Sequence, residues 1–327
     1  MNHVGEKMKS ITLLVVSDLD VGSTIQGNVL LSRGGWIEMD SVDGGRVWHH
    51  SRSPVHLWWR NESHLFSDHL DETYINSTDF EISEVLFLSR HVAASGLPSL
   101  TLHAIGVLGS EPFGEAAEYG GINGLAVPPS PRFASLFRRL NRIAKIHGLT
   151  DEFDITLETT HHGPLLMTPS LFIEIGSTAE HWGREDAANV WADVLSEELG
   201  LESTIPASQN NEVVMVGIGG GHYAPRHRNV LLETNALAGH LLANYSLNMY
   251  RPEGDWDPLS DRLPDGPWMN SIDVAIKQTT ESFPNQKVVA HLDRKSFKGW
   301  QRQSIKRYLE SINIEIFRLA DFVNFES

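Results

Sequence analysis

The chain has 327 residues, of which 41% are hydrophobic and 21% are charged, a balance that suits a large folded core and excludes a disordered polypeptide. It contains no cysteine, which excludes disulfides, thiolate-bound metals and a cysteine nucleophile, so any zinc ion has to be held by His, Asp or Glu. The formal net charge of −16 argues against a protein that coats nucleic acid without specificity.

The apolar runs and the chain length predict the location and domain organisation of the protein. No apolar run approaches the roughly 20 residues that cross a bilayer. The first apolar run, at residues 11–16, is too short for the core of a signal peptide. We therefore expect a cytoplasmic protein that binds no membrane. The length predicts one compact unit over residues 1–327, or two closely packed subdomains with a boundary near residues 128–150.

The first half of the chain predicts short buried strands and one clear helix. Residues 34–79 are irregular and predict strands and loops, and a helix is expected near Thr24. After a proline-rich break, apolar residues recur at spacings of three and four up to Gly148, which is typical of an amphipathic helix with a glycine at its end. The expected strands are residues 11–16, 85–88 and 100–103, and the expected helix is residues 132–147.

The second half alternates strands with helices, which is typical of an α/β protein. Strands are expected at residues 153–157, 170–175, 213–218 and 287–290. Helices are expected at residues 185–199, 231–250 and 296–311, with a loop rich in proline, aspartate and glycine at 251–269. The predicted fold is therefore an α/β fold with a mixed, largely parallel sheet flanked by helices.

Histidines follow several of the predicted strands directly. His103 ends one strand, His161 and His162 follow Glu158 at the end of another, and His222 follows a third. In open α/β sheets, ligands gather beyond the carboxyl ends of the strands, so these side chains are expected to meet. Because side chains alternate along extended chain, His161 and His162 are expected to point in opposite directions. An ordinary polar loop with two incidental histidines is the simpler alternative for this pair.

Three consecutive glycines, Gly219, Gly220 and Gly221, separate a predicted strand from His222, Tyr223 and Arg226. Glycines let the backbone approach a ligand closely, and their N–H groups suit a phosphate or a developing oxyanion. The segment is not a dinucleotide fingerprint, because His222 occupies the position of its last glycine, and no P-loop lysine follows. A flexible turn is the alternative, although a turn rarely needs histidine, tyrosine and arginine directly after it.

Other residues give weaker signals. His91 and His103 are either pocket residues or histidines satisfied within the core, and Glu174 is either a buried carboxylate or a polar group at a strand end. The zinc-protease helix motif HExxH and the nucleophile-elbow motif GxSxG are both absent.

Two basic stretches stand out from the acidic background. On helices such stretches are either solvated polar faces or phosphate contacts for a tRNA. The candidates for phosphate contacts are Arg138, Arg139, Arg142 and Lys145 in the first stretch and Lys295, Lys298 and Arg302 in the second.

Taken together, these motifs resemble the archaeal D-aminoacyl-tRNA deacylase family, which plants share. The matching segments are SRH at 89–91, LTLH at 100–103, YGG at 119–121, THHGP at 160–164, FIEIGST at 172–178, GHYAPR at 221–226, GH at 239–240 and DRK at 293–295. The resemblance implies a core similar to peptidyl-tRNA hydrolase with an additional smaller domain. It also implies zinc dependence and cleavage of the ester that joins a D-amino acid to tRNA, as proofreading of mischarged tRNA.

These observations suggest a hydrolytic mechanism in which water attacks the ester carbonyl. His161, His162 and His222 either hold a zinc ion that lowers the pKa of water, or one of them is the general base. Glu158 either orients the base or acts as an acceptor, and the amides of Gly219–Gly221 stabilise the oxyanion. The other substrate-binding candidates are His91, His103, Tyr223 and Arg226.

Two other functions remain open at this point. One is a metal-dependent hydrolase of small esters or amides, and the other is a non-catalytic tRNA-binding module. The expected partner is aminoacylated tRNA and not DNA, and the sequence leaves open whether the chain is a monomer or a homodimer.

Overall fold

A computed structural model describes residues 9–109, 119–202 and 212–325 of the chain. Its largest element is an eight-stranded sheet in the order β2-β3-β4-β1-β5-β10-β6-β9. The strands are β1 (Lys9–Ser17), β2 (Trp36–Val42), β3 (Gly45–His50), β4 (Val55–Arg60), β5 (Phe80–Arg90), β6 (Ser99–His103), β9 (Asp154–Leu157) and β10 (Ser170–Gly176).

The large sheet is mixed, as the sequence predicts. β1 pairs in parallel with β4 and β5, β10 with β5, and β9 with β6. The pairings β2–β3, β3–β4 and β6–β10 are antiparallel. The strands expected at residues 11–16, 85–88, 100–103, 153–157 and 170–175 all belong to this sheet, and the expectation of a largely parallel sheet is confirmed.

Three helices cover one face of the large sheet: α1 (Val21–Ser32), α4 (Phe133–Ile146) and α6 (Glu185–Leu199). α4 is the amphipathic helix of the sequence, and it buries Phe133, Leu136 and Leu140 in the shared core. Gly148 follows α4 with a φ of 72°, a left-handed conformation that glycine adopts without strain. The opposite face carries α2 (Leu70–Ser77), which packs against β5.

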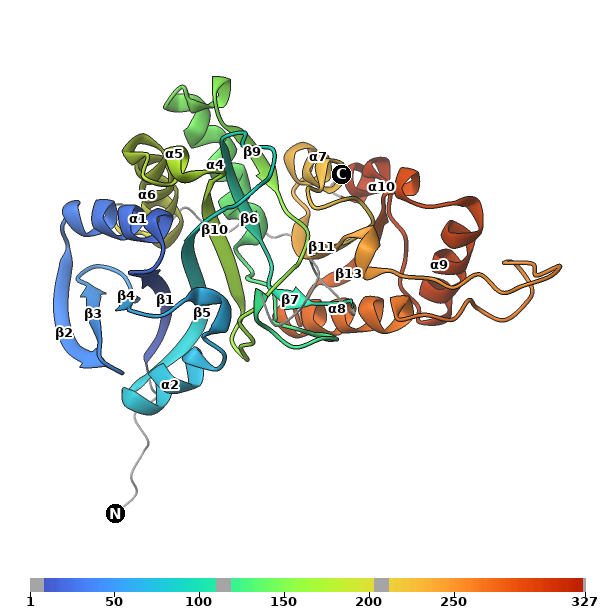
Figure 1. The fold of residues 1–327 in the computed structure, drawn as a ribbon, viewed down its shortest axis with the longest axis horizontal. Coiled ribbons are helices and arrows are strands. Elements are labelled where there is room, and N and C mark those ends of the chain that lie inside the picture. The colour runs from blue at the N-terminus through green and yellow to red at the C-terminus, as the bar shows by residue number, and fades with distance from the viewer. Residues whose placement is uncertain (1–8, 110–118, 203–211, 326–327) are drawn as a thin grey trace, which may run out of the picture.

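A second sheet lies beside the first, on the right of Figure 1. Its strands β11 (Val213–Ile218), β12 (Leu237–Leu242) and β13 (Lys287–Leu292) are all parallel, in the order β12-β11-β13. The helices α7 (Pro225–Glu233), α8 (Trp268–Ser282), α9 (Gly299–Ser311) and α10 (Leu319–Phe325) surround it. Val213 and Met215 of β11 belong to the same apolar cluster as α4, so the two sheets share one continuous core.

The remaining described elements are short. They are β7 (Gly106–Val107) and β8 (Leu125–Ala126), α5 (Ala179–Trp182), and single 3₁₀ turns at His64–Phe66, Leu149–Asp151, Asn244–Ser246 and Arg294–Ser296. None of the helices in the described parts of the chain has the length and apolar character that crossing a bilayer requires.

The helix expected over residues 231–250 is wrong. The chain instead ends α7 at Glu233 and forms β12 at Leu237–Leu242. From Ala238 to Leu242 every residue of β12 is buried, and a strand covered on both faces lacks the alternation that distinguishes a strand from a helix. α8 also begins inside the segment expected to be a loop, at Trp268, whose side chain is fully buried.

Candidate active site

A polar row crosses the face of the large sheet opposite helices α1, α4 and α6. In β6, Ser99, Thr101 and His103 alternate with Leu100 and Leu102, and the two leucines belong to the helix-covered core. The strand register places Glu174 of β10 opposite Thr101 on one side and Ser89 of β5 on the other. Thr101 Oγ1 donates a hydrogen bond of 3.2 Å to Glu174 Oε2. The polar site therefore extends over a face of the sheet and is not confined to the carboxyl ends of the strands.

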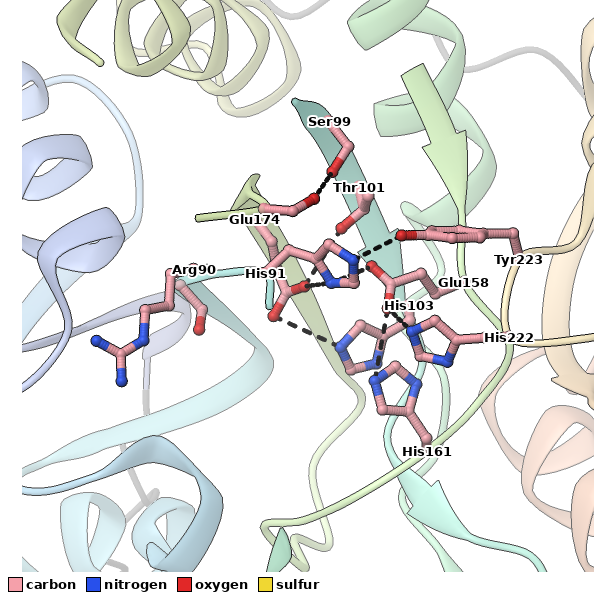
Figure 2. A network of polar contacts seen from close by, with 12 residues as sticks. Arg90, His91, Ser99, Thr101, His103, Glu158, His161, Glu174, His222 and Tyr223 are labelled. Atoms are coloured by element: carbon pink, nitrogen blue, oxygen red, sulfur yellow. Dashed lines mark hydrogen bonds and ion pairs between the residues drawn. The ribbon is translucent and has the colours of Figure 1, made fainter. Parts of the chain in front are cut away.

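Two buried glutamates organise the histidines that surround this row (Figure 2). The Glu158 carboxylate has no exposed surface, and its oxygens lie 2.7 Å from His222 Nε2, 3.1 Å from His91 Nδ1 and 3.6 Å from His161 Nε2. Glu174 lies 3.3 Å from His91 Nδ1 and 3.7 Å from His103 Nε2. The carboxylates and imidazoles thus form one connected network, the arrangement that buried charges require.

The charges in this network are fixed by mutual contact. Burial alone would lower the pKa of His91, but Glu158 and then Glu174 outweigh burial and raise this pKa to about 9. Burial would raise the pKa of Glu174, but the neighbouring His103 and His91 rings hold this pKa well below its usual range. His91 is therefore a cation at neutral pH, held between two carboxylates.

The histidine trio, His103, His161 and His162, forms a second part of the site. The Nδ1–H group of each ring donates to a backbone carbonyl: His103 to Ala104 at 3.0 Å, His161 to Thr159 at 2.6 Å and His162 to Gly163 at 2.6 Å. These bonds fix the tautomers and leave Nε2 as the lone-pair atom of each neutral ring.

Burial also sets the protonation of two members of the trio. Burial, with the positive neighbour His103, lowers the pKa of His161 well below its usual value and that of His162 to about 3. Burial would likewise lower the pKa of His103, but Glu174 raises it. Two of the three imidazoles are thus held in the neutral form that binds a metal ion.

The donor set fits a zinc ion. One donor atom from each member of the trio lies within 4.8 Å of the others, and zinc prefers imidazole nitrogens. Backbone carbonyls that accept from the opposite ring nitrogens are the usual support for such ligands. His91, Glu158 and His222 form a second group of this size. The sequence-predicted ligands His161 and His162 thus group with His103, whereas His222 groups with His91 and Glu158.

Both rings of the adjacent pair contact the same partner, so the expectation that they point in opposite directions is wrong. The ring centroids of His161 and His162 lie 3.9 and 4.7 Å from that of His103. The reason is local: His162 has a φ of 44°, so the segment is not extended and its side chains do not alternate.

A cavity of about 590 Å³ opens onto the network. His91, His222, Tyr223 and Glu174 line its polar side, together with His161 and His162 of the trio. Leu19, Leu65 and Val92 line it elsewhere, and Leu19 and Val92 are exposed. We call this the active-site cavity. Apolar walls with convergent polar groups are typical of a substrate pocket.

Most of the predicted site residues gather around this cavity. They are Glu158, His161, His162, His222, His91, His103 and Tyr223, and Tyr223 Oη lies 2.8 Å from His91 Nε2. Arg226 does not belong to this group, because its guanidinium pairs with Asp293 at 2.9 Å and lines a different cavity.

The expected role of Gly219 and Gly220 as amide donors to an oxyanion is wrong. The Gly219 amide donates to the Leu242 carbonyl at 2.8 Å, and the Gly220 amide donates to Ser296 Oγ at 2.8 Å. Both glycines have positive φ, 98° and 109°, so their conformational freedom shapes the turn that carries His222.

The two basic stretches differ in their surroundings. Arg138 donates to the carbonyls of Leu231, Thr234 and Ala236, while Arg139 and Arg142 pair with Glu197 of α6. These three arginines therefore hold α4 against its neighbours. Lys145 is exposed on α4, and Lys295 and Lys298 are exposed between β13 and α9. Arg302 donates to the carbonyls of Arg294 and Phe297.

Sequence reasoning undervalued Glu174 and did not single out Thr101. A signal was present in β6, because Ser99, Thr101 and His103 alternate with leucines although this strand does not lie at an edge of the sheet. In a strand covered on both faces, a polar residue at every second position indicates a buried polar site.

Comparisons with known proteins agree with this geometry. Residues 78–317 match the family model described as D-aminoacyl-tRNA deacylase. A protein of that name from Arabidopsis thaliana is 40% identical over 326 residues, covering 95% of this chain and 99% of the relative. A D-aminoacyl-tRNA deacylase from Pyrococcus furiosus is 32% identical over 309 residues, covering 94% of this chain and 99% of the relative.

A solved structure extends the comparison to the fold. The crystal structure of a conserved protein of unknown function, AF0625, has a TM-score of 0.76 and 25% identity, and the match covers 97% of this chain and 98% of the other. The motif resemblance, the family model and relatives matched over nearly their whole length all agree. The chain belongs to the D-aminoacyl-tRNA deacylase family.

Proposed function

We propose that this chain hydrolyses the ester bond of D-aminoacyl-tRNA and releases a free D-amino acid and tRNA. The observation that carries the chemistry is the contact between the buried Glu158 carboxylate and His222, whose side chain is 27% exposed at the active-site cavity. A carboxylate that orients a histidine beside a substrate pocket is an arrangement suited to general base catalysis.

In this proposal His222 is the general base. Its Nε2 atom lies 2.7 Å from Glu158 Oε2, and the negative carboxylate favours a proton on this nitrogen, which makes Nδ1 the basic atom. Nδ1 accepts a proton from water as the water oxygen attacks the ester carbonyl. The imidazolium then returns that proton to the ribose oxygen as the tetrahedral intermediate collapses, and Glu158 stabilises the transient positive charge.

Tyr223 takes the oxyanion role that the engaged Gly219 and Gly220 amides cannot fill. The cationic His91 donates Nε2–H to Tyr223 Oη at 2.8 Å, so the phenol proton is directed to another acceptor. Burial, together with Glu158, raises the pKa of Tyr223 to about 12, so the phenol stays protonated. Its hydroxyl lines the active-site cavity and donates to the carbonyl oxygen as negative charge develops there.

The histidine trio would hold a zinc ion through the Nε2 atoms of His103, His161 and His162, and His103 would have to lose its Nε2 proton to do so. Such an ion supplies Lewis acidity and lowers the pKa of a water that it binds. Glu158 borders this trio through His161, at 3.6 Å, so one carboxylate contacts both the general base and the trio. We assign tRNA phosphate contacts to Lys295 and Lys298, which are exposed, and we place the protein in the cytoplasm.

The decisive experiment is deacylation of D-Tyr-tRNA and L-Tyr-tRNA by the purified chain. We expect loss of the D-ester and retention of the L-ester. Loss of activity with a chelator and recovery with added zinc would support the metal assignment. Bound zinc, measured directly, should be lost in the variant His162→Ala and retained in the control His69→Ala, whose ring is exposed. Turnover of neither ester under any metal condition would overturn the proposed function.

An added excess of uncharged tRNA separates this function from that of a small-ester hydrolase. A deacylase that recognises tRNA should be inhibited competitively. A hydrolase of small esters or amides should be unaffected by the nucleic acid.

A further inference from the structure

A second cavity, of about 840 Å³, lies beside the small sheet and has no part in the chemistry above. Cationic side chains from four separate segments line it: Arg226 at the start of α7, Arg294 after β13, Lys306 of α9, and Arg318 just before α10. Figure 1 shows these elements grouped at the side of the molecule away from α1 and β2. We call it the basic cavity.

Three of these cations are not neutralised. Arg226 pairs with Asp293 at 2.9 Å, but Arg294, Lys306 and Arg318 form no ion pair within the described residues. Of the two acidic residues that line the cavity, Glu315 is engaged by Lys287 at 2.5 Å, which leaves Glu310. An excess of positive charge around a hollow, in a chain of net charge −16, indicates an anionic ligand.

His291 adds a hydrogen-bond acceptor to the basic cavity, which a simple anion would not need. His227 Nε2–H donates to the Gly219 carbonyl at 2.9 Å, so the lone pair of His227 is on Nδ1. That atom lies 2.8 Å from His291 Nδ1, which must therefore be the donor. Neutral His291, which lines the cavity, consequently carries its lone pair on Nε2. Hydroxyl and amino groups donate to such an atom.

We propose that the basic cavity binds the ribose-phosphate backbone of the tRNA acceptor strand, with phosphates on Arg294, Lys306 and Arg318 and a sugar hydroxyl on His291. RNA is the polymer that combines phosphates with 2′-hydroxyl donors. This inference rests on the proposed function, because it names how the same substrate is held away from the reacting ester.

The position of the cavity fits this role. Tyr223 lines the active-site cavity and Arg226 lines the basic cavity, and three residues of chain span at most about 11 Å. The terminal aminoacylated nucleotide would occupy the active-site cavity while nucleotides just before it reach the basic cavity. Contacts of this kind position a substrate and bring salt dependence with them.

The test is the double variant Lys306→Ala/Arg318→Ala, compared with the wild type and with Lys277→Ala. Lys277 is the matched control, because it is an exposed lysine of α8 whose ion-pair partner, Glu281, lies on the same helix. For D-Tyr-tRNA we expect KM to rise about tenfold or more in the double variant, with kcat preserved. The slope of log KM against log salt should become shallower by about 1 to 2.

Two further measurements make the result decisive. D-tyrosyl-adenosine, which carries no phosphate, should be hydrolysed equally by the double variant and the wild type, which also shows that the variant is folded. Binding of uncharged tRNA, followed by fluorescence anisotropy, needs no turnover and should weaken about tenfold in the double variant only.

Unchanged tRNA affinity in the double variant, or an equal loss on D-tyrosyl-adenosine, would overturn the inference. Failure of the wild type to cleave either ester would instead overturn the proposed function. The anisotropy measurement would still decide the role of the basic cavity in that case.

Discussion

His222 Nε2 lies 2.7 Å from an oxygen of Glu158, a carboxylate with no exposed surface. A buried carboxylate in this position fixes the tautomer of the histidine and stabilises its protonated form. Glu158→Gln keeps the shape of the side chain but removes its charge. We expect kcat for D-Tyr-tRNA to fall about 10²- to 10⁴-fold with little change in KM. Glu180→Gln, on exposed α5, should behave as the wild type, and a Glu158→Gln enzyme that keeps more than half its kcat would refute the assignment.

Tyr223→Phe removes one hydroxyl and no packing. If that hydroxyl donates to the developing oxyanion, kcat should fall about 10²- to 10³-fold while KM stays within twofold. Tyr245→Phe is the matched control, since Tyr245 Oη lies 3.4 Å from Thr159 Oγ1, one residue from Glu158. Steady-state kinetics on D-Tyr-tRNA measure both variants. Equal effects in the two would show that the Tyr223 hydroxyl has no special role.

Gly219 and Gly221 should respond differently to alanine. A Cβ at Gly219 would come within 2.5 Å of the Phe297 ring, and its φ of 98° disfavours any side chain. A Cβ at Gly221 meets nothing within 4 Å. We expect Gly219→Ala to lower the free energy of unfolding by about 2–4 kcal/mol, and Gly221→Ala to change it by less than about 1 kcal/mol. Urea denaturation measures both, and equal stabilities would contradict the described turn.

The free energy of unfolding should fall on mild acidification, because His56 is buried in its neutral form. Burial, and then the neighbouring His49, lower the pKa of His56 from 6.5 to about 4. The unfolded chain therefore binds a proton at this residue between pH 6.5 and 4 while the folded chain does not, so stability is lost as pH falls through that window. The contribution is up to about 3 kcal/mol.

The variant His56→Gln tests this contribution, because an amide still provides an acceptor for Tyr74 Oη, which lies 2.7 Å from His56 Nδ1. Its Tm should depend less on pH than that of the wild type between pH 6.5 and 4. His69→Gln, at an exposed position, is the control and should keep the wild-type dependence. A His56→Gln profile parallel to the wild type would place the acid sensitivity elsewhere.

Much of the fold could be predicted because local patterns and tertiary structure agree. The helix expected at residues 185–199 is found as α6 with the same bounds, ended by Gly200 in a left-handed conformation. β12 could not be recognised, because its buried Leu and Ala residues suit a helix equally well. The assembly of the site was predictable in part, from histidines placed after strands.

Three features of the site depend on contacts that no local pattern encodes. The pairing of Glu158 with His222 joins segments 64 residues apart in the sequence, which follow strands of different sheets. The convergence of His161 and His162 depends on one left-handed residue. The engagement of the Gly219 and Gly220 amides depends on Leu242 and Ser296, which follow in the chain.

The core that α4 shares with both sheets has a consequence for how the molecule unfolds. Val213 and Met215 of the small sheet pack in the same apolar cluster as Phe137 and Leu140 of α4 and Leu100 of the large sheet. Separating the two sheets would expose this apolar cluster to water. Both sheets should therefore unfold in a single cooperative transition. Activity should then be lost together with the fold and not before it, because the contact between His222 and Glu158 joins the two sheets.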